Sequence, residues 1–228
     1  MKFNMFNQYI LLISSIFYFI IWAQFAGSYN PIQPDSNGYL YFFSGTGAGA
    51  NRIAGYPVFL LLMNNLKFTL IQIGYIQLGI FVCSFYFLLN SLLKFGISKL
   101  IVGLLFVSLL INPFFNKFHF MILTESLSFS FLLIFLGLIM SLLRGAANTS
   151  IVMLGVIIGL LAILKPVSLI FFPIGIMFLF LLLLIAKTQS FQKYLLCFSL
   201  LCAPCLMVLY AEKLVFFSAH DEKYSQVT

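Results

Sequence analysis

The sequence predicts an all-α membrane protein, a polytopic transmembrane helical bundle with about seven spans. Of its 228 residues, 63% are hydrophobic and only 7% are charged, whereas ordinary globular domains are about 25% charged. Several apolar runs reach the length of about 18 residues that marks a transmembrane helix. The period-two alternation typical of a transmembrane β-barrel is not seen in these runs. A soluble fold is therefore excluded by composition.

The chain carries a formal net charge of +7, but its basic residues are scattered singly along the sequence. A nucleic-acid-binding surface needs clustered Lys and Arg side chains to neutralise phosphates. We therefore predict no nucleic-acid partner. The four cysteines, Cys83, Cys197, Cys202 and Cys205, all lie within apolar runs. We interpret them as small buried hydrophobic residues in preference to metal ligands.

The whole chain, residues 1–228, is expected to form a single transmembrane domain. The predicted spans lie near residues 9–26, 68–93, 97–111, 121–143, 151–164, 167–186 and 194–211. Residues 26–28 (AGS) resemble a signal-peptide cleavage site, but the apolar run before them is longer than a typical signal sequence has. An uncleaved first helix is therefore the favoured interpretation. Beyond the seventh span we expect a polar tail, residues 212–228, with no fold of its own.

The longest polar interruption is the loop of residues 27–67. It is predicted to carry two short helices at the membrane surface. The first, residues 36–43, is rich in interfacial aromatic side chains. The second, residues 56–66, is apolar but too short to span, and Pro57 lies in its first turn. The glycine-rich run at residues 45–49 lacks the Gly-Lys-Ser/Thr ending of a phosphate-binding loop, so we interpret it as a flexible loop tip.

All five acidic residues fall on one side of the predicted bundle. The basic residues divide equally between the two sides, so the positive-inside rule alone does not orient the chain. We place the acid-free side in the cytoplasm. The chain is then expected in the cytoplasmic membrane, as part of the cell envelope, with its first loop facing outward.

Two of the predicted spans, residues 97–111 and 151–164, are too short to cross the bilayer. A helix of 14 residues, the length of the second, measures only about 21 Å at about 1.5 Å per residue, against a hydrocarbon core of about 30 Å. Each is followed by a proline at its outer end. We therefore expect an outward-facing cavity in the outer leaflet, with Lys165 inside it, because irregular backbone at that depth needs protein or water around it. Such a cavity suits a lipid substrate with a polar head group.

Asp35 and Glu125 are the candidate catalytic residues. Asp35 precedes a turn-forming sequence, where it is either a helix N-cap or a general base that removes a proton from an acceptor hydroxyl. Glu125 stands at the outer end of the fourth predicted span. It is either an acid favoured by the helix dipole or an active-site acid, since an unpaired carboxylate is costly near lipid.

Arg52 and Lys165 are the candidate phosphate-binding residues, because Arg grips a phosphate bidentately and Lys meets it as a point charge. Either could instead be a snorkelling side chain at the interface. His119 is a candidate base or metal ligand, although the absence of a second histidine nearby in the sequence favours an ordinary polar loop residue.

Four sequence segments together resemble a known family. They are residues 35–40 (DSNGYL), 52–60 (RIAGYPVFL), 124–127 (TESL) and 165–166 (KP). In this order they are similar to motifs of the GT-C superfamily of membrane glycosyltransferases. Those enzymes use polyprenyl- or dolichyl-phosphate sugars and are related to protein mannosyltransferases and aminoarabinose transferases. The resemblance extends over a shared seven-helix module that covers nearly the whole chain.

The resemblance implies an inverting transferase that takes a sugar from a lipid-linked donor at the outer membrane face. Asp35 would be the general base, and Arg52 and Lys165 would bind the donor phosphate. Tyr56, in the second segment, is placed with His119 among the substrate-binding residues. Some relatives also use a divalent metal, but nothing in this sequence requires one, and no metal ligands are assigned.

The chain departs from that family in two ways. Its first loop carries one acid where many relatives have a pair, and it stops soon after the seventh predicted span. A non-catalytic scaffold or accessory subunit of envelope glycan assembly, with a protein partner, is therefore an alternative, as is a truncated inactive copy. A small-solute or lipid transporter is a third hypothesis, although no convincing internal repeat is visible in the sequence.

Overall fold

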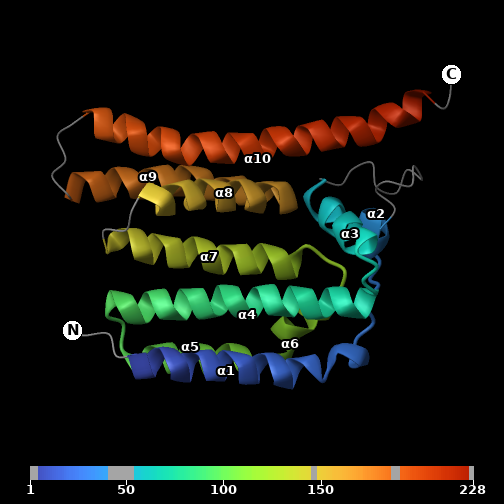
Figure 1. The fold of residues 1–228 in the computed structure, drawn as a ribbon, viewed down its shortest axis with the longest axis horizontal. Coiled ribbons are helices and arrows are strands. Elements are labelled where there is room, and N and C mark those ends of the chain that lie inside the picture. The colour runs from blue at the N-terminus through green and yellow to red at the C-terminus, as the bar shows by residue number, and fades with distance from the viewer. Residues whose placement is uncertain (1–4, 41–53, 145–147, 186–190, 226–228) are drawn as a thin grey trace. The chain divides into compact units, whose positions relative to one another are not determined.

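The computed structural model describes residues 5–40, 54–144, 148–185 and 191–225 (Figure 1). These residues form helices and contain no strand, so the predicted all-α fold is confirmed. Within these described ranges, four helical segments are long and apolar enough to cross a membrane: Gln8–Ser28, Leu70–Phe95, Glu125–Leu143 and Leu196–Leu214. They match the first, second, fourth and seventh predicted spans. The third, fifth and sixth fall on shorter apolar helices, so a total of seven spans stays a prediction.

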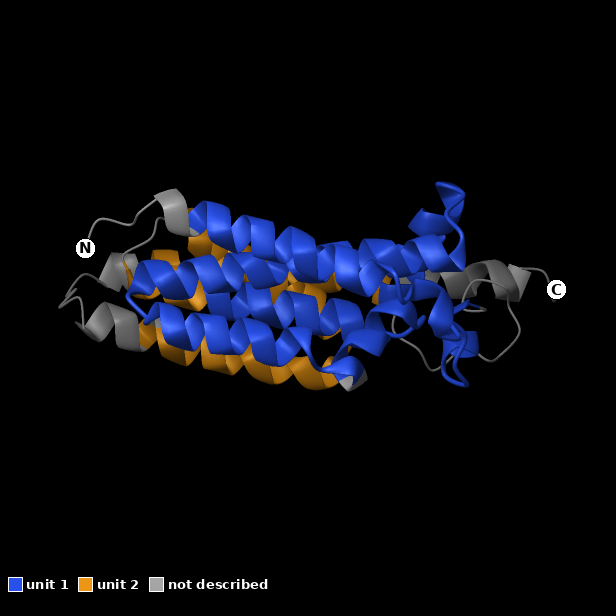
Figure 2. Ribbon diagram, turned by 90° about the horizontal axis from the view of Figure 1, so that it is seen from below, with its two compact units in different colours: residues 1–52, 56–137 blue, residues 53–55, 138–228 orange. Residues whose placement is uncertain are grey.

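The helices group into two compact units (Figure 2). Unit 1 comprises residues 1–52 and 56–137, and unit 2 comprises residues 53–55 and 138–228. The elements found in unit 1 are α1 (Met5–Ala23), η1 (Ala26–Ser28), α2 (Ser36–Leu40), α3 (Gly55–Asn65, from its second residue), α4 (Leu70–Phe95), α5 (Lys99–Leu110), α6 (Pro113–Asn116), η2 (Lys117–Phe120) and the first part of α7 (Glu125–Leu143). Helices α2 and α3 thus lie at the two short helices predicted in the first loop, although residues 41–43 of the first prediction lie outside the described residues.

Aromatic side chains fill the core of unit 1, where α1 packs against α4. Tyr18 of α1 is buried against Phe81 and Phe85, which stand one turn apart on α4, with their ring centroids 5.8 Å apart. The hydroxyl of Tyr18 donates a hydrogen bond to the side chain of Asn116. Because lipid tails are as apolar as these rings, close packing and such polar links must hold the helices together.

Local sequence explains where α4 begins and ends and where α5 begins. Thr69 and Gln72 form a reciprocal capping box at the start of α4. Gly96 ends the helix at φ 104°, a left-handed conformation that glycine adopts without strain. Ser98 then caps α5 by accepting a hydrogen bond from the backbone N–H of Ile101 at 3.3 Å. The chain therefore reverses direction within a few residues.

Unit 2 is organised by a close contact between two helices. Its elements are the end of α7, α8 (Asn148–Leu164), η3 (Pro166–Ile170), α9 (Phe171–Ile185) and α10 (Phe191–Ser225). Gly155 and Gly159 of α8 face α10, and a Cβ on Gly155 would lie only 2.2 Å from the carbonyl oxygen of Leu201. This small-xxx-small spacing lets two helix backbones approach closely.

The structure differs from the expected boundaries at three places. The tail expected to have no fold continues α10 as far as Ser225; residues 205–225 contain no Gly or Pro to stop it. At the other end of unit 2, α8 has 17 residues, or about 26 Å. This is longer than predicted and closer to the thickness of the hydrocarbon core, which is about 30 Å. The 12 residues of α5, in contrast, reach only about 18 Å. Finally, α7 begins at Glu125, four residues after the predicted start.

Candidate functional site

The backbone of Ile122 ties the first loop to the segment that leads into α7. The amide of Ile122 donates to the carbonyl oxygen of Pro31 at 2.8 Å, and its carbonyl accepts from the hydroxyl of Ser36 at 2.9 Å. Ser36 and Ile122 are both fully buried. The Ser36 hydroxyl also accepts from the backbone N–H of Gln33 at 2.9 Å. The turn that contains Asp35 is therefore fixed beside the head of α7.

This tie brings the two predicted catalytic acids to one end of unit 1. Asp35 directly precedes α2, at the N-cap position, and its side chain is exposed. Glu125 is the first residue of α7, three residues after Ile122, and is half-buried. A carboxylate in the first turn of a helix is favoured by the helix dipole. The N-cap interpretation of Asp35 and its role as an accessible base remain compatible.

Tyr56, a predicted substrate-binding residue, is buried in the first turn of α3. Its hydroxyl donates to the side-chain oxygen of Gln77 at 3.1 Å, and its ring meets that of Tyr39 edge-on at 5.2 Å. Burial raises the pKa of the Tyr56 hydroxyl well above its usual value, and negative charge on Tyr39 and Glu125 raises it further. Tyr56 therefore remains a neutral hydrogen-bond donor beside the acidic residue of α7.

Gln77 is a site-supporting residue that sequence reasoning missed. It is fully buried in α4, and its amide nitrogen donates to the carbonyl oxygens of His119 at 3.0 Å and Met121 at 3.2 Å. Its oxygen accepts from Tyr56. One side chain thus joins α3, α4 and the segment before Glu125. The available signal was a strongly polar amide inside an apolar span, which is costly there unless it has partners.

These contacts also explain the late start of α7. The carbonyl groups of His119, Met121 and Ile122 accept hydrogen bonds from the side chains of Gln77 and Ser36. Met121 has extended backbone angles, φ −100° and ψ 145°. Backbone groups that are already satisfied by tertiary partners gain nothing further from joining a helix. The helix therefore begins only at Glu125.

His119 is buried, although its sequence context favoured a polar loop residue. Its Nδ1 lies 2.8 Å from the hydroxyl of Ser126, and its ring packs on Phe81 with centroids 4.4 Å apart. Burial lowers the pKa of His119 to about 3, so the imidazole is neutral at pH 7. A substrate has no access to this side chain in the conformation described.

The two predicted phosphate-binding cations have different outcomes. Arg52 lies outside the described residues, as does the glycine-rich run at residues 45–49. Lys165 is half-buried in unit 2, at the junction between α8 and η3, and its carbonyl oxygen accepts from the N–H of Ser168 at 2.9 Å. That Arg52 and Lys165 share one cavity with Asp35 and Glu125 stays a prediction.

The end of the first loop is anchored within unit 2. Gly55 lies against the last turn of α8, where a Cβ would meet the carbonyl oxygen of Ile163 at 2.3 Å. The amide of Ala54 donates to a carboxylate oxygen of Glu212 at 3.1 Å. Glycine at position 55 is therefore required by this close approach, and residues 54–55 connect the last turn of α8 with α10.

In the part of the chain that the structure describes, no three side chains of His, Cys, Asp or Glu lie together as a metal-binding group. Comparison of the chain with protein-family models, with curated proteins and with solved structures finds no match. The candidate site therefore has to be interpreted from its own residues.

Proposed function

We propose that the chain is a membrane glycosyltransferase that moves a sugar from a polyprenyl-phosphate-linked donor to an acceptor. One observation carries the proposal: Ser36 and Pro31 hold the turn of Asp35 against Ile122, beside Glu125. An exposed carboxylate, on a turn that is tied to the segment just before a second, half-buried carboxylate, suits proton transfer from an acceptor. The family resemblance of the surrounding segments supports the same reaction.

In the proposed reaction Asp35 accepts a proton from the acceptor hydroxyl. The acceptor oxygen then forms a bond to the anomeric carbon from the face opposite the leaving group. The bond between that carbon and the phosphate oxygen breaks, and polyprenyl phosphate leaves with the electron pair. Configuration at the sugar is inverted, and no covalent sugar–enzyme intermediate forms.

Glu125 is proposed to bind the acceptor and to orient it toward Asp35. It is the first residue of α7, at the positive end of the helix dipole. Tyr56 supports this arrangement as a buried neutral donor, whose hydroxyl donates a hydrogen bond to Gln77. Arg52 and Lys165 are proposed to bind the donor phosphate, which takes two negative charges as the sugar departs.

We also propose a topology for this reaction. The shorter helices α5, α8 and α9 cross the membrane together with the four longer ones, which gives seven spans. The first loop then faces outward from the cytoplasmic membrane, where a lipid-linked sugar presents its head group. The short length of α5 supports a polar recess in the outer leaflet.

The test is turnover of labelled polyprenyl-phosphate sugars by the purified chain in lipid nanodiscs. We expect release of polyprenyl phosphate and transfer of the label to an acceptor. The Glu125→Gln variant should lower kcat/KM, whereas Glu222→Gln, a matched substitution outside the proposed site, should not. If no donor in a broad panel is turned over while the chain co-purifies with a larger envelope enzyme, the chain is an accessory subunit and the proposal fails.

A further inference from the structure

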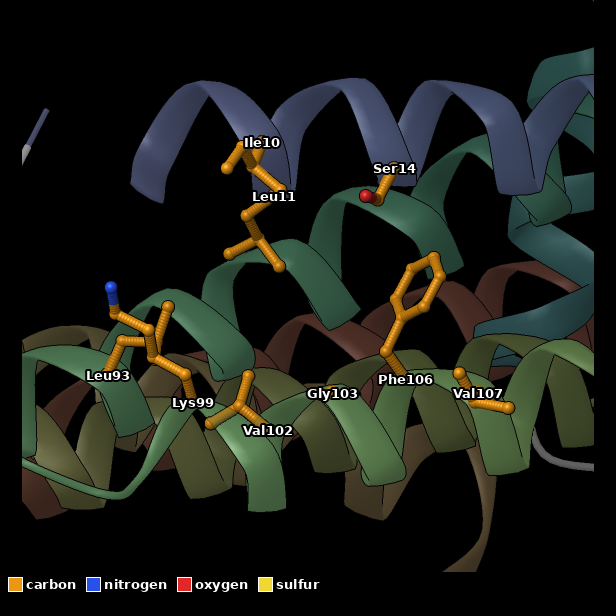
Figure 3. Close-up of a pocket in the computed structure, with 9 residues that line it drawn as sticks. All are labelled: Ile10, Leu11, Ser14, Leu93, Lys99, Val102, Gly103, Phe106 and Val107. Atoms are coloured by element: carbon orange, nitrogen blue, oxygen red, sulfur yellow. The ribbon is translucent and has the colours of Figure 1, made fainter. Parts of the chain in front are cut away.

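A pocket in unit 1 is lined by none of the residues of the candidate site. It is a cavity of about 240 Å³ between α1, α4 and α5. Figure 3 shows its lining, which includes Leu11 and Ser14 of α1, Leu93 of α4, and Lys99, Gly103 and Val107 of α5. From Lys99 to Val107 the pocket follows α5 for about 12 Å at about 1.5 Å per residue. It is therefore an elongated groove and not a compact hole.

The chemistry of the groove changes along its length. Its walls are apolar, apart from the hydroxyl of Ser14 part-way along and the amino group of Lys99 at one end (Figure 3). Lys99 is exposed and makes no ion pair with any residue that the structure describes. The groove thus offers an apolar channel with a single positive charge at its mouth.

The surroundings of this mouth are basic. Lys94 lies in the last turn of α4, close in sequence to Lys99, which begins α5. The acids of unit 1 that the structure describes, Asp35 and Glu125, belong to the opposite end: α1 runs from the groove toward the turn of Asp35, which is tied to the head of α7. The electrostatic field at the groove mouth therefore favours an anion.

We propose that this groove binds one anionic phospholipid, with an acyl chain between α1 and α5 and its phosphate at Lys99. The neighbouring surface of α5 is apolar and exposed, as at Leu100 and Leu104, with 73% and 62% exposure, so bilayer lipid is the solvent that reaches the groove. The inference is independent of the proposed transferase activity.

The charge, and not the acyl chain, must supply the selectivity. An acyl chain gains little by leaving the bilayer for an equally apolar groove. A lysine near the membrane surface favours an anionic head group by about 1 kcal/mol, which corresponds to about a fivefold preference. The groove therefore sets the position of the bound lipid, and Lys99 sets the preference for an anionic head group.

Substitution of Gly103 tests the groove independently of Lys99. A Cβ built on this residue meets nothing within 4 Å, although the residue lines the groove. We expect a leucine there to occupy the groove, because its Cβ has open space around it, and to favour the helix more than glycine does. Gly27 is a matched control, because a Cβ on it also meets nothing within 4 Å and it does not line the groove.

The experiment is native mass spectrometry of the full chain released from micelles that contain phosphatidylglycerol or phosphatidylcholine with identical acyl chains. We expect one retained phosphatidylglycerol at about fivefold higher apparent affinity than phosphatidylcholine. Lys99→Ala should remove this preference and Lys94→Ala should largely keep it. Gly103→Leu, which places a side chain in the groove, should lower the retention of both lipids, whereas Gly27→Leu should not.

Three results would overturn the proposal. They are equal retention of the two lipids by the wild-type chain, an unchanged preference in Lys99→Ala, and unchanged retention in Gly103→Leu. Glycerol phosphate serves as a probe of the head group alone. If it displaces the lipid at comparable concentration, the site binds a free phosphate and the acyl-chain groove is not its basis. Far-UV circular dichroism of each variant verifies that helical content is unchanged.

Discussion

Replacing Gln77 by leucine should destabilise unit 1 and loosen the segment that carries Glu125. The substitution keeps the approximate size of the side chain but removes one acceptor and one amide donor group. Three hydrogen bonds are lost, to the hydroxyl of Tyr56 at 3.1 Å and to the carbonyl oxygens of His119 at 3.0 Å and Met121 at 3.2 Å. All three partners lie where water does not easily replace the lost contact, since Gln77 is fully buried.

The magnitude follows from the number of bonds. Side-chain hydrogen bonds between membrane helices average about 0.6 kcal/mol each and reach about 1.7. Loss of three bonds therefore lowers the free energy of unfolding by about 2 to 5 kcal/mol. Gln72→Leu is the matched control on the same helix. Gln72 is exposed and serves the capping box, so its loss should cost about 1 kcal/mol.

The assay is unfolding in mixed micelles of increasing sodium dodecyl sulfate content, followed by the fluorescence of Trp22. This is the single tryptophan of the chain, and in unit 1 its indole N–H donates to the carbonyl oxygen of Leu110 at 3.0 Å. A destabilisation of Gln77→Leu no larger than that of Gln72→Leu would refute the reasoning. It would mean that Gln77 does not join α3, α4 and the segment before α7.

Two further predictions concern the same end of unit 1. Burial lowers the pKa of His119 from 6.5 to about 3, so its contribution to stability is complete above pH 6.5 and is lost as the pH falls toward 3, by about 2 kcal/mol at pH 5. Unfolding curves at pH 7.5 and 5 should show this loss in wild type and in His220→Gln but not in His119→Gln; equal pH dependence in all three would contradict it. Ser36→Ala removes the hydroxyl that bridges Gln33 and Ile122. It should lower the free energy of unfolding by about 1–3 kcal/mol in the same assay, and it should also lower the rate of sugar transfer. Ser28→Ala, the control, should change neither quantity.

Much of the fold could be predicted because helix formation here depends on local sequence. Apolar runs gave the positions of the long helices, and the turn-forming residues around Thr69 and Gly96 mark the limits of α4. The two short helices of the first loop were recognised from their aromatic and proline content, and they appear as α2 and α3. Polar residues at the predicted ends of spans also indicated the segments of Asp35 and Glu125.

What could not be predicted depends on contacts between distant segments. The start of α7 is set by Gln77 and Ser36, which lie 44 and 86 residues away in sequence from the backbone groups that they bind. His119 is buried by the rings of Phe81 and Phe115, and the sequence around His119 does not indicate this burial. The length of α10 was underestimated because polar composition was given more weight than helix propensity.

The central claim is tested most directly by the initial rate of polyprenyl phosphate release from a lipid-linked sugar donor, measured for wild-type and Asp35→Asn chains in the same nanodiscs. A general base contributes about 10²- to 10⁴-fold to a rate, so Asp35→Asn should be slower by at least about 100-fold. Asp221→Asn, with the same change outside the proposed site, should retain the wild-type rate. Equal rates for wild type and Asp35→Asn would contradict the proposed reaction.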